Sequence, residues 1–494
     1  MKRLLSVLII LSMLLSFSGC KPSKNDDTTG NQNSGGSPTT DNAPTEETPI
    51  NVNGVKITEY NIVCDTDGLD YNMRAAEYIR DSIYSATGCK LSIVDDSEVA
   101  KDREIVVGET ARPISQELNT DTVGFQFAML ANGGSVALEA DYFVIAAAAY
   151  YFVDTYVSGS DTVIPDGLTV RTPVTKEAKN YILLIGDGMG VYQTMLYDYL
   201  TNTSDYSDGE DYFYGYMFPY LGLARTSSFT GVTDSAAAGT ALATGYKTYN
   251  KYIGVDKDGN ERKSLTELAA ELGKATAVMS TETNSGATPS TFSAHELHRD
   301  NKSEIMADQT ALTQQYGTII ECGFDYYTAK YMKSSVEKRI TETLTALDKN
   351  EDGFFLMYEE AHIDKHCANN DMEKAFLALI RFNQAIARFM EYAFYNPDTV
   401  VIITADHETG GLSPSQFDGN LYFLTEDHTS ADVPVFAWGH GTEIFNEKAV
   451  ENIEIAQFFA SSMGVNDFGD KSGDWYNEIY PGGGTHLPII PVQS

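Results

Sequence analysis

Short apolar runs alternate with amphipathic segments through most of the chain from residue 179 onward. The segments 265–272 and 372–395 have helical periodicity, with apolar residues recurring every three or four positions. Strands that alternate with helices predict a mostly parallel central sheet with helices on both faces, because each crossover helix packs back on the sheet. We therefore predict one large α/β domain from 178 to 494. The runs predicted as its strands are 181–185, 275–279, 354–357, 400–403 and 433–437.

A second pattern of short strands and helices spans residues 51–175. The segments 71–86 and 140–157 have helical periodicity, whereas 104–108 is typical of a buried strand. The sequence 103–113 resembles the small α/β domain found ahead of many secreted carbohydrate-active enzymes. Because the region contains no histidine and no cluster of catalytic side chains, we interpret it as a small α/β domain that serves packing or binding.

The first twenty residues have the parts of an export signal. A basic start precedes the apolar stretch 4–15, which is too short to span a bilayer comfortably, and Cys20 ends a sequence that resembles a bacterial lipobox. We therefore predict a lipoprotein signal peptide over 1–20, a lipid anchor at Cys20 and an extracytoplasmic location on the bacterial cell membrane. An ordinary cleaved signal is the alternative. Residues 21–50 are polar and rich in Gly, Ser and Thr, which predicts a disordered linker.

Composition narrows the classes of partner. The formal net charge of −36 argues against nucleic acid and anionic membrane surfaces as direct partners. The 494 residues, 42% of them hydrophobic, are enough for more than one folded domain. The chain has only eight histidines, so their positions carry weight. No Cys-x-x-Cys pair occurs, and the spacing of Cys64 and Cys89 leaves open whether they are bonded or free.

The segment 233–240 places Ser235 between Asp234 and a run of tiny residues. A helical pattern continues from there to Gly245, so Ser235 is predicted in the first turn of a helix. Unpaired backbone N–H groups in that turn favour an alkoxide or a phosphate ester, and small neighbours leave room for a substrate. The plain alternative is that Ser235 is only the N-cap of an alanine-rich helix.

Further polar side chains follow directly after predicted strands, where binding sites form in parallel sheets. Asp187 lies in a Gly-Asp-Gly-Met-Gly turn after 181–185, and its carboxylate could approach a cation or simply form an Asx turn. Asp406 and His407 follow 400–403 and offer one oxygen and one nitrogen ligand, a mixture suited to zinc. A polar loop is the alternative for this pair.

The densest set of candidate ligands lies in 358–367, which contains three carboxylates, two histidines and a thiol. His428 is a further candidate, shortly before the run 433–437. Thr288 is predicted to open a helix whose later turn presents Arg299. A guanidinium group clamps a phosphoryl group with two parallel hydrogen bonds, so Arg299 is a candidate for binding phosphate.

These motifs, in this order along the chain, resemble the alkaline phosphatase family over about 179–465. The resemblance implies an alkaline phosphatase-like catalytic domain with two zinc sites, a nearby magnesium site and Ser235 as the nucleophile. It also implies that Arg299 grips the transferred phosphate, that Asp234 orients Arg299 and that Lys365 lies near the phosphate. The implied ligands are Asp364 and His428 for the first zinc, Asp187, Asp406, His407 and Ser235 for the second zinc, and Asp187, Thr288 and Glu359 for magnesium.

Two positions depart from the family pattern. The family has a histidine four residues after Asp364, where this chain has Ala368. Cys367 lies on nearly the same helical face as Asp364 and could bind zinc as a thiolate, whereas His366 would need a local change of register. The alternative is that water fills the gap or that the first metal binds weakly. Gly286 stands where the family commonly has Asp or His, which alters the surroundings of the magnesium site.

The sequence thus predicts metal-dependent hydrolysis of phosphate monoesters through a phosphoserine, acting on small phosphorylated substrates. A phosphodiesterase or a sulfatase on the same scaffold is an alternative, because the fold alone does not choose the substrate. A surface lipoprotein with impaired turnover is a further alternative, supported only by Ala368. We expect hydrolysis of the phosphoserine to limit the rate, and the resemblance leaves a homodimer open. The remaining histidines are predicted to be structural or exposed: His295, His298, His362, His440 and His486.

Overall fold

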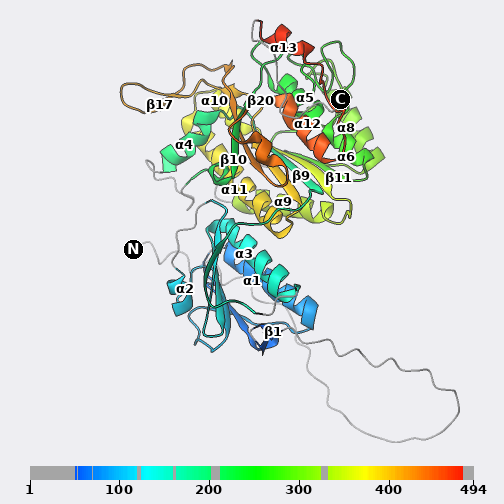
Figure 1. Ribbon diagram of the computed structural model, residues 1–494. Coiled ribbons are helices and arrows are strands. Elements are labelled where there is room, and N and C mark those ends of the chain that lie inside the picture. Colours follow the sequence, from blue (N-terminus) through cyan, green and yellow to red (C-terminus); the bar gives the residue numbers. More distant parts are fainter. Residues whose placement is uncertain are drawn as a thin grey trace, which may run out of the picture. The chain divides into compact units, whose positions relative to one another are not determined.

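The computed structural model describes residues 51–52, 54–68, 70–118, 124–159, 163–201, 212–323 and 332–481 (Figure 1). The predicted signal peptide, Cys20, the predicted linker and His486 lie outside the described residues. In the part of the chain that is described, no helix is long and apolar enough to cross a membrane.

An eight-stranded sheet forms the centre of the larger α/β region, in the order β12-β11-β13-β9-β14-β19-β10-β20. The five strands from β12 to β14 are parallel, and β19 pairs antiparallel with both of its neighbours. All five predicted strands are present, which confirms the predicted mostly parallel α/β fold. The strands are β9 (Asn180–Gly186), β10 (Tyr220–Arg225), β11 (Ala275–Ser280), β12 (Ile319–Cys322), β13 (Phe354–Glu360), β14 (Thr399–Thr404), β19 (Val433–Trp438) and β20 (Ala449–Glu451).

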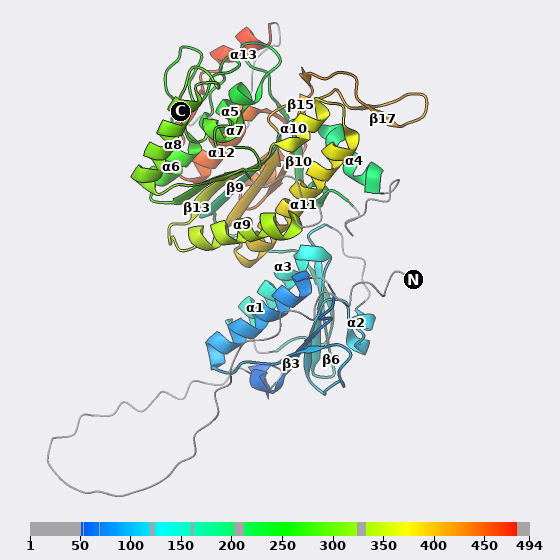
Figure 2. The same ribbon diagram turned by 180° about the vertical axis from the view of Figure 1, so that it is seen from behind.

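Helices cover both faces of this sheet (Figures 1 and 2). The long helix α11 packs on β9, β13 and β14 and against α9, while α6 packs on β11 and β13 from the side that also carries α5 and α12. Helix α11 could be predicted over its full length because it has a buried stripe of alanine and aromatic residues. The helices are α4 (Val191–Thr201), α5 (Ser235–Thr244), α6 (Leu265–Glu271), α7 (Ala287–Thr291), α8 (Lys302–Tyr316), α9 (Met332–Leu347), α10 (His362–Cys367), α11 (Met372–Tyr395), α12 (Asn452–Ser462) and α13 (Asp474–Ile479).

A six-stranded mixed sheet occupies the region predicted as the small α/β domain, in the order β4-β3-β5-β7-β6-β8. The predicted helices and the predicted strand are present, the second helix as α3 flanked by a 3-10 turn and a π-helical turn. Cys64 and Cys89 are both free thiols. The limits and role of this domain stay predictions. Its elements are β3 (Asn61–Cys64), α1 (Asp70–Thr87), β4 (Ile93–Asp95), β5 (Glu104–Val107), α2 (Pro113–Glu117), β6 (Phe127–Asn132), β7 (Ser135–Glu139), α3 (Ile145–Phe152) and β8 (Gly167–Arg171), preceded by the short pair β1 (Asn51–Val52) and β2 (Val55–Lys56).

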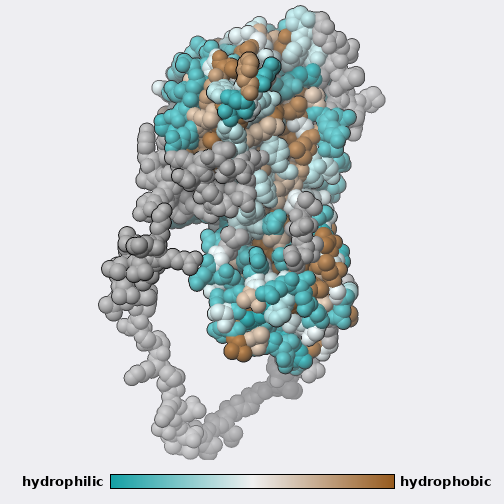
Figure 3. All heavy atoms as spheres, turned by 90° about the vertical axis from the view of Figure 1, so that its left-hand side faces the viewer, coloured by the Kyte–Doolittle hydropathy of each residue, from teal (hydrophilic) through white to brown (hydrophobic). Residues whose placement is uncertain are grey.

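Two short hairpin-like pairs lie between β14 and β19. One joins β15 (Glu408–Thr409) to β18 (His428–Thr429), and the other joins β16 (Ser413–Pro414) to β17 (Leu421–Tyr422). The connection from β16 to β17 carries the fully exposed Phe417, and apolar patches lie among polar residues on the side of the molecule to which β17 points (Figure 3).

The prediction that Arg299 sits on the helix opened by Thr288 is wrong. Helix α7 ends at Thr291, and Arg299 lies in the following loop. The helix stops because the chain that follows it forms an isolated antiparallel β-bridge. In this bridge the backbones of Ile253 and Glu296 exchange two hydrogen bonds of 2.8 Å. A long-range pairing of this kind has no local signal in the sequence.

Candidate active site

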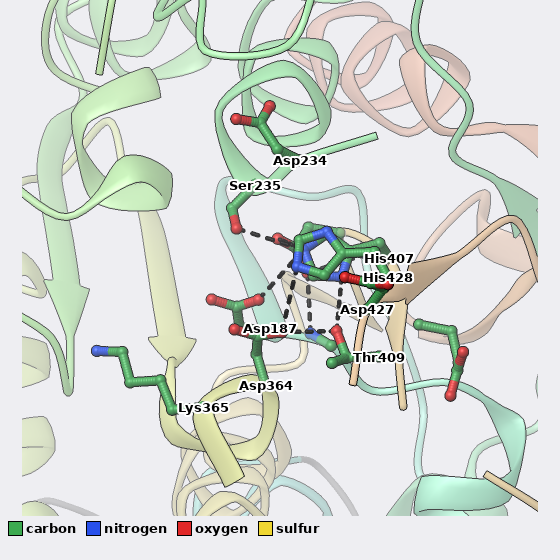
Figure 4. A network of polar contacts seen from close by, with 12 residues as sticks. Asp187, Asp234, Ser235, Asp364, Lys365, His407, Thr409, Asp427 and His428 are labelled. Carbon is green, nitrogen blue, oxygen red and sulfur yellow. Dashed lines mark hydrogen bonds and ion pairs between the residues drawn. The ribbon is translucent and has the colours of Figure 1, made fainter. Parts of the chain in front are cut away.

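One edge of the eight-stranded sheet collects most of the predicted site residues (Figure 4). Asp187 follows β9, Glu359 lies at the end of β13, and Asp406 with His407 follows β14. His428 precedes β19, but β19 runs antiparallel to β14, so its beginning lies at the same edge where β14 ends. The residues that follow the parallel strands and the residue that precedes the antiparallel strand β19 therefore meet at one edge of the sheet. Binding sites form at this edge in sheets of this class.

Ser235 is the first residue of α5, and Asp234 is the N-cap. The carboxylate of Asp234 accepts a hydrogen bond of 3.0 Å from the amide of Ala237, so the alternative that Ser235 is merely the cap is wrong. Ser235 Oγ lies 3.3 Å from His407 Nε2, and the residue is buried among the small side chains of α5. Ser235 therefore lies at the start of a helix, where the helix dipole favours negative charge.

His407 is the centre of the first group of ligand atoms. Its Nε2 lies 3.6 Å from Asp187 Oδ1 and 3.3 Å from Asp406 Oδ2, and all three residues are buried. Burial lowers the pKa of His407, so the ring is neutral and has a lone pair for a cation. The structure thus brings together the residues predicted to hold the second zinc, with Ser235 beside them.

Asp406 is oriented by the backbone around it. Its Oδ1 accepts hydrogen bonds from the amides of Gly188 and His407, at 3.1 and 2.9 Å. Its Oδ2 is buried without a hydrogen-bond partner among the described residues. One oxygen is therefore held in place while the other is presented to the cluster, an arrangement that fits a metal ligand.

A glycine in the turn after β9 allows this turn to lie close to Asp364 on α10. Gly188 has a φ of +72°, and a Cβ there would lie 2.8 Å from the Cα of Asp364 and 2.9 Å from Thr409 Oγ1. Only glycine therefore permits the turn after β9 to pack against α10. This close approach places Asp187 and Asp364 on adjoining parts of the site.

Asp364, His428 and His407 form the second group of ligand atoms. His428 Nδ1 donates a hydrogen bond of 2.9 Å to the carbonyl of Thr233, so Nε2 is the nitrogen that faces the site, 3.5 Å from Asp364 Oδ1. The rings of His407 and His428 stack with their centroids 3.5 Å apart. This group contains the two residues predicted for the first zinc, and it shares His407 with the other group.

Neither predicted substitute for the missing histidine joins these groups. The amide of Ala368 donates to the carbonyl of Asp364 at 2.8 Å, so the helical register is regular. Ala368 therefore occupies the position one turn after Asp364, where the family has its histidine. Cys367 is buried, and burial followed by the charges of Asp364 and Glu408 raises the pKa of its thiol. His366 lies near Asp371, away from Asp364, and burial lowers its pKa. Cys367 as a zinc ligand stays a prediction.

A deeper set of oxygen atoms surrounds Glu359. Asp187 Oδ1, Thr288 Oγ1 and Glu359 Oε1 are all buried with no hydrogen-bond partner in the described residues. Burial, together with the charge of Glu282, raises the pKa of Glu359 to about 8, and burial with the charge of Asp406 raises that of Asp187. Buried anionic oxygens without partners are costly, and a cation would compensate them. The residues predicted for magnesium therefore fit a hard cation that prefers oxygen ligands.

Arg299 and Lys365 each pair with a carboxylate beside the cluster. Arg299 Nη1 donates to Asp234 Oδ2 at 3.3 Å, and two further hydrogen bonds from the amide of Lys251 fix that carboxylate. Asp234 therefore couples the start of α5 to the guanidinium group. Lys365 extends away from the histidines, and its Nζ lies 2.7 Å from Glu282 Oε1 (Figure 4).

Histidines outside the two groups have structural partners or face solvent. His362 Nδ1 lies 3.1 Å from Thr281 Oγ1, and His440 is exposed. His295 Nε2 lies 3.1 Å from Glu267 Oε1, and its Nδ1 lies 2.9 Å from the carbonyl of Gly254. The ion pair ties the loop after α7 to the first turn of α6.

The ion pair of His295 predicts a specific pH dependence of stability. Burial alone lowers the pKa of His295, but the hydrogen bond and charge of Glu267 outweigh it and raise the pKa to about 9 from 6.5. The contribution is therefore complete below pH 6.5 and lost as the pH rises through 9. Relative to His295→Gln, the wild type should lose about 1 to 3 kcal/mol of unfolding free energy over that range, measured by urea denaturation. A difference independent of pH would contradict this.

Sequence reasoning missed two residues of the site. Thr409 Oγ1 donates to Asp364 Oδ1 at 2.6 Å and lies 3.1 Å from His407 Nδ1, so it links the two ligand groups. Its position two residues after His407, in the motif that also contains Asp406, could have identified it from the sequence. Glu282 lies two residues after the end of β11, at the carboxyl edge of the sheet, and the rule that sites form at the carboxyl ends of parallel strands could have found it.

The fold and the site define an α/β protein with a buried serine beside two adjoining groups of metal-binding side chains. A sequence model of the family described as alkaline phosphatase matches residues 178–324 and 323–424. The chain belongs to the alkaline phosphatase family.

Two curated relatives match this chain over part of its length. Alkaline phosphatase 3 of Bacillus subtilis is 32% identical over 292 residues, which are 48% of this chain and 62% of the relative. Alkaline phosphatase 4 of the same organism is 31% identical over 290 residues, 48% of this chain and 63% of the relative. The matched part therefore spans less than two thirds of both relatives.

Solved structures of the family share the fold. The alkaline phosphatase from the Antarctic bacterium TAB5 is 27% identical with a TM-score of 0.52, and the match covers 59% of this chain and all of that one. A mutant of that enzyme with magnesium bound in its M3 site matches at 26% identity with a TM-score of 0.51, over 59% of this chain and 100% of that one.

Proposed function

We propose that this protein hydrolyses phosphate monoesters through a phosphoserine intermediate on Ser235. The observation that carries the proposal is the placement of Ser235 Oγ at the start of α5, 3.3 Å from His407 Nε2. Membership of the alkaline phosphatase family supports hydrolysis of phosphoesters. The buried carboxylates around the serine support dependence on divalent cations.

The side chains present fit zinc and magnesium. Asp187, Asp406 and His407 would hold one zinc, with mixed nitrogen and oxygen ligands. Asp364 and His428 would hold the other. When bound, such cations lower the pKa of a serine hydroxyl and neutralise charge on phosphoryl oxygens. Three oxygen ligands, from Asp187, Thr288 and Glu359, would hold magnesium, and the magnesium bound in the TAB5 mutant is consistent with this assignment.

The protein side chains have separate tasks in the reaction. Ser235 Oγ gives up its proton to solvent and attacks phosphorus in line, so that an O–P bond forms as the bond to the leaving oxygen breaks. The leaving oxygen keeps the bonding electrons and takes a proton from water. The start of α5 favours negative charge, and the guanidinium of Arg299, oriented by Asp234, binds two phosphoryl oxygens. Water then cleaves the phosphoserine and regenerates the hydroxyl.

A comparison of substrates tests the reaction class. After reconstitution with zinc and magnesium, rates are measured on an aryl phosphate, a bis-aryl phosphate and an aryl sulfate. The proposal predicts that the aryl phosphate is hydrolysed fastest, because its dianionic phosphoryl group offers more charge to Arg299 and the cations than the singly charged diester or sulfate. A faster rate on the diester or the sulfate would assign the site to the alternative class.

Ala368 predicts slow breakdown of the phosphoserine. Dephosphorylation depends most on the Asp364 and His428 end, which lacks the family's histidine one turn after Asp364. A substrate with a good leaving group should therefore give a burst of product followed by a slower steady rate in stopped-flow measurements. Ala368→His should raise the steady rate by roughly threefold or more and reduce the burst. A wild type without a burst would contradict the prediction, and so would a variant with an unchanged rate.

We also propose, on sequence grounds, that the protein is exported and anchored through lipid on Cys20. The polar linker 21–50 would hold the catalytic region away from the membrane. Its substrates would then be small phosphorylated molecules outside the cytoplasm. Homodimer formation stays an open expectation.

A further inference from the structure

We infer that Glu282 supplies the third cation site with the acidic group that position 286 lacks. The inference rests on the proposed function, because it assigns a ligand to the magnesium site proposed above. Its starting point is steric: a Cβ placed on Gly286 would lie 2.7 Å from Glu282 Oε2, 2.8 Å from its Cγ and 2.9 Å from its Cδ. The carboxylate of Glu282 therefore fills the space that a side chain at position 286 would enter.

Glu282 is tied to the same framework as Glu359. The amide of Glu282 donates to Ser280 Oγ at 2.9 Å, and Ser280 Oγ in turn donates to the carboxylate of Glu359. The strands β11 and β13 that carry these residues are parallel neighbours, with Ser280 paired with Glu359. The backbone of Glu282 is thus fixed relative to Glu359, and its carboxylate is directed toward the start of α7, where Thr288 lies.

Glu282 lies beside the proposed ligands of the third site, because Ser280 Oγ contacts both the amide of Glu282 and the carboxylate of Glu359. Together with Thr288 these side chains form an all-oxygen set without nitrogen or sulfur, which favours magnesium over zinc.

The ion pair between Glu282 and Lys365 suggests a second task for the carboxylate. Its Oε1 contacts Lys365 Nζ at 2.7 Å, while Oε2 is the oxygen that faces Gly286. One carboxylate oxygen thus positions the lysine and the other is available to the cation or to its bound water. The plain alternative is that Glu282 only pairs with Lys365, in which case Lys365→Met and Glu282→Gln should have equal effects.

Magnesium binding to the full-length, zinc-loaded protein tests the inference without using activity. Isothermal titration calorimetry with Mg²⁺, and metal analysis after dialysis, are applied to wild type, Glu282→Gln and Lys365→Met. We expect Glu282→Gln to weaken magnesium binding by about tenfold or more, and Lys365→Met to weaken it less. Zinc content should be unchanged. Glu271→Gln is the matched control, because that glutamate is exposed and pairs only with Lys263.

Moving the carboxylate from position 282 to position 286 provides a second test. Gly286→Asp alone should bind magnesium poorly or unfold at lower temperature, because two acidic side chains then compete for one space. The double variant Glu282→Ala, Gly286→Asp should recover magnesium affinity to within about threefold of wild type. Thermal unfolding of the zinc-loaded proteins identifies any variant that fails to fold.

The outcomes separate the two proposals. Equal magnesium affinity in wild type and Glu282→Gln overturns the inference alone, and so does equal loss in Glu282→Gln and Lys365→Met. If the wild type binds no magnesium, the inference and the magnesium part of the proposed function both fail. If magnesium binds as expected but no phosphate is released from any monoester, the inference stands as a metal site and the proposed activity fails.

Discussion

Replacing Ser235 with alanine should reduce phosphate release by at least about a thousandfold, because the reaction then has no nucleophile. The loss should appear in kcat rather than in KM, since Arg299 and the ligand groups that bind the phosphoryl group are untouched. The rate is measured by release of inorganic phosphate from an aryl phosphate after zinc and magnesium reconstitution.

A matched control separates chemistry from folding. Ser303 is an exposed serine in the first turn of α8, so Ser303→Ala makes the same change at the same kind of helical position without touching the site. Both variants should unfold within a few degrees of the wild type, and only Ser235→Ala should be inactive. Residual activity above about a tenth of wild type in Ser235→Ala would assign the nucleophile to another group.

Replacing Asp187 with asparagine should abolish activity and remove most of the stabilisation that metal gives. Asp187 is buried beside His407, and burial followed by the charges of Asp406 and Asp364 raises its pKa well above the usual value. Stability therefore falls as the pH rises from the usual carboxyl pKa of 3.8 toward the raised pKa of the folded state, because over that range only the unfolded chain releases the proton. At pH 9 in chelator, Asp187→Asn should therefore be more stable than the wild type by about 1 to 3 kcal/mol.

Zinc should invert that order. The wild type should gain several degrees of thermal stability on adding zinc and magnesium, whereas Asp187→Asn should gain little, because it lacks a ligand shared by two proposed cation sites. Scanning calorimetry with and without metal measures both effects. Asp258→Asn, a neutralised exposed aspartate, should behave as the wild type. Equal stabilisation of both proteins by zinc would contradict the assignment of Asp187.

The central sheet could be predicted because its strands are nearly continuous apolar runs. β9, β13 and β14 are buried over their whole length, and each ends in the polar residues that form the site. The rule that sites form at the carboxyl ends of parallel strands was therefore enough to group Asp187, Glu359 and Asp406. The direction of β19 could not be predicted, since an antiparallel strand in this sheet has the same composition as its parallel neighbours.

The parts that failed depend on contacts between distant segments. The sequence around Arg299 gave no sign that Glu296 would pair with Ile253 and end α7 early. Cys367 as a zinc ligand beside Asp364 stays a prediction, although its thiol is not in the ligand groups found among the described residues. Glu282 could have been considered from its place after a predicted strand, but its relation to Gly286 follows from the space beside that glycine, which only the folded chain reveals.

Trapping the covalent intermediate tests the proposed reaction most directly. The reconstituted protein is mixed with an aryl phosphate and quenched in acid within the first turnovers, and its peptides are analysed by mass spectrometry. We expect one added phosphoryl group on the peptide that contains Ser235, absent from Ser235→Ala. Rapid release of phosphate with no phosphorylated peptide at any quench time, or with the phosphoryl group on another residue, would contradict catalysis through Ser235.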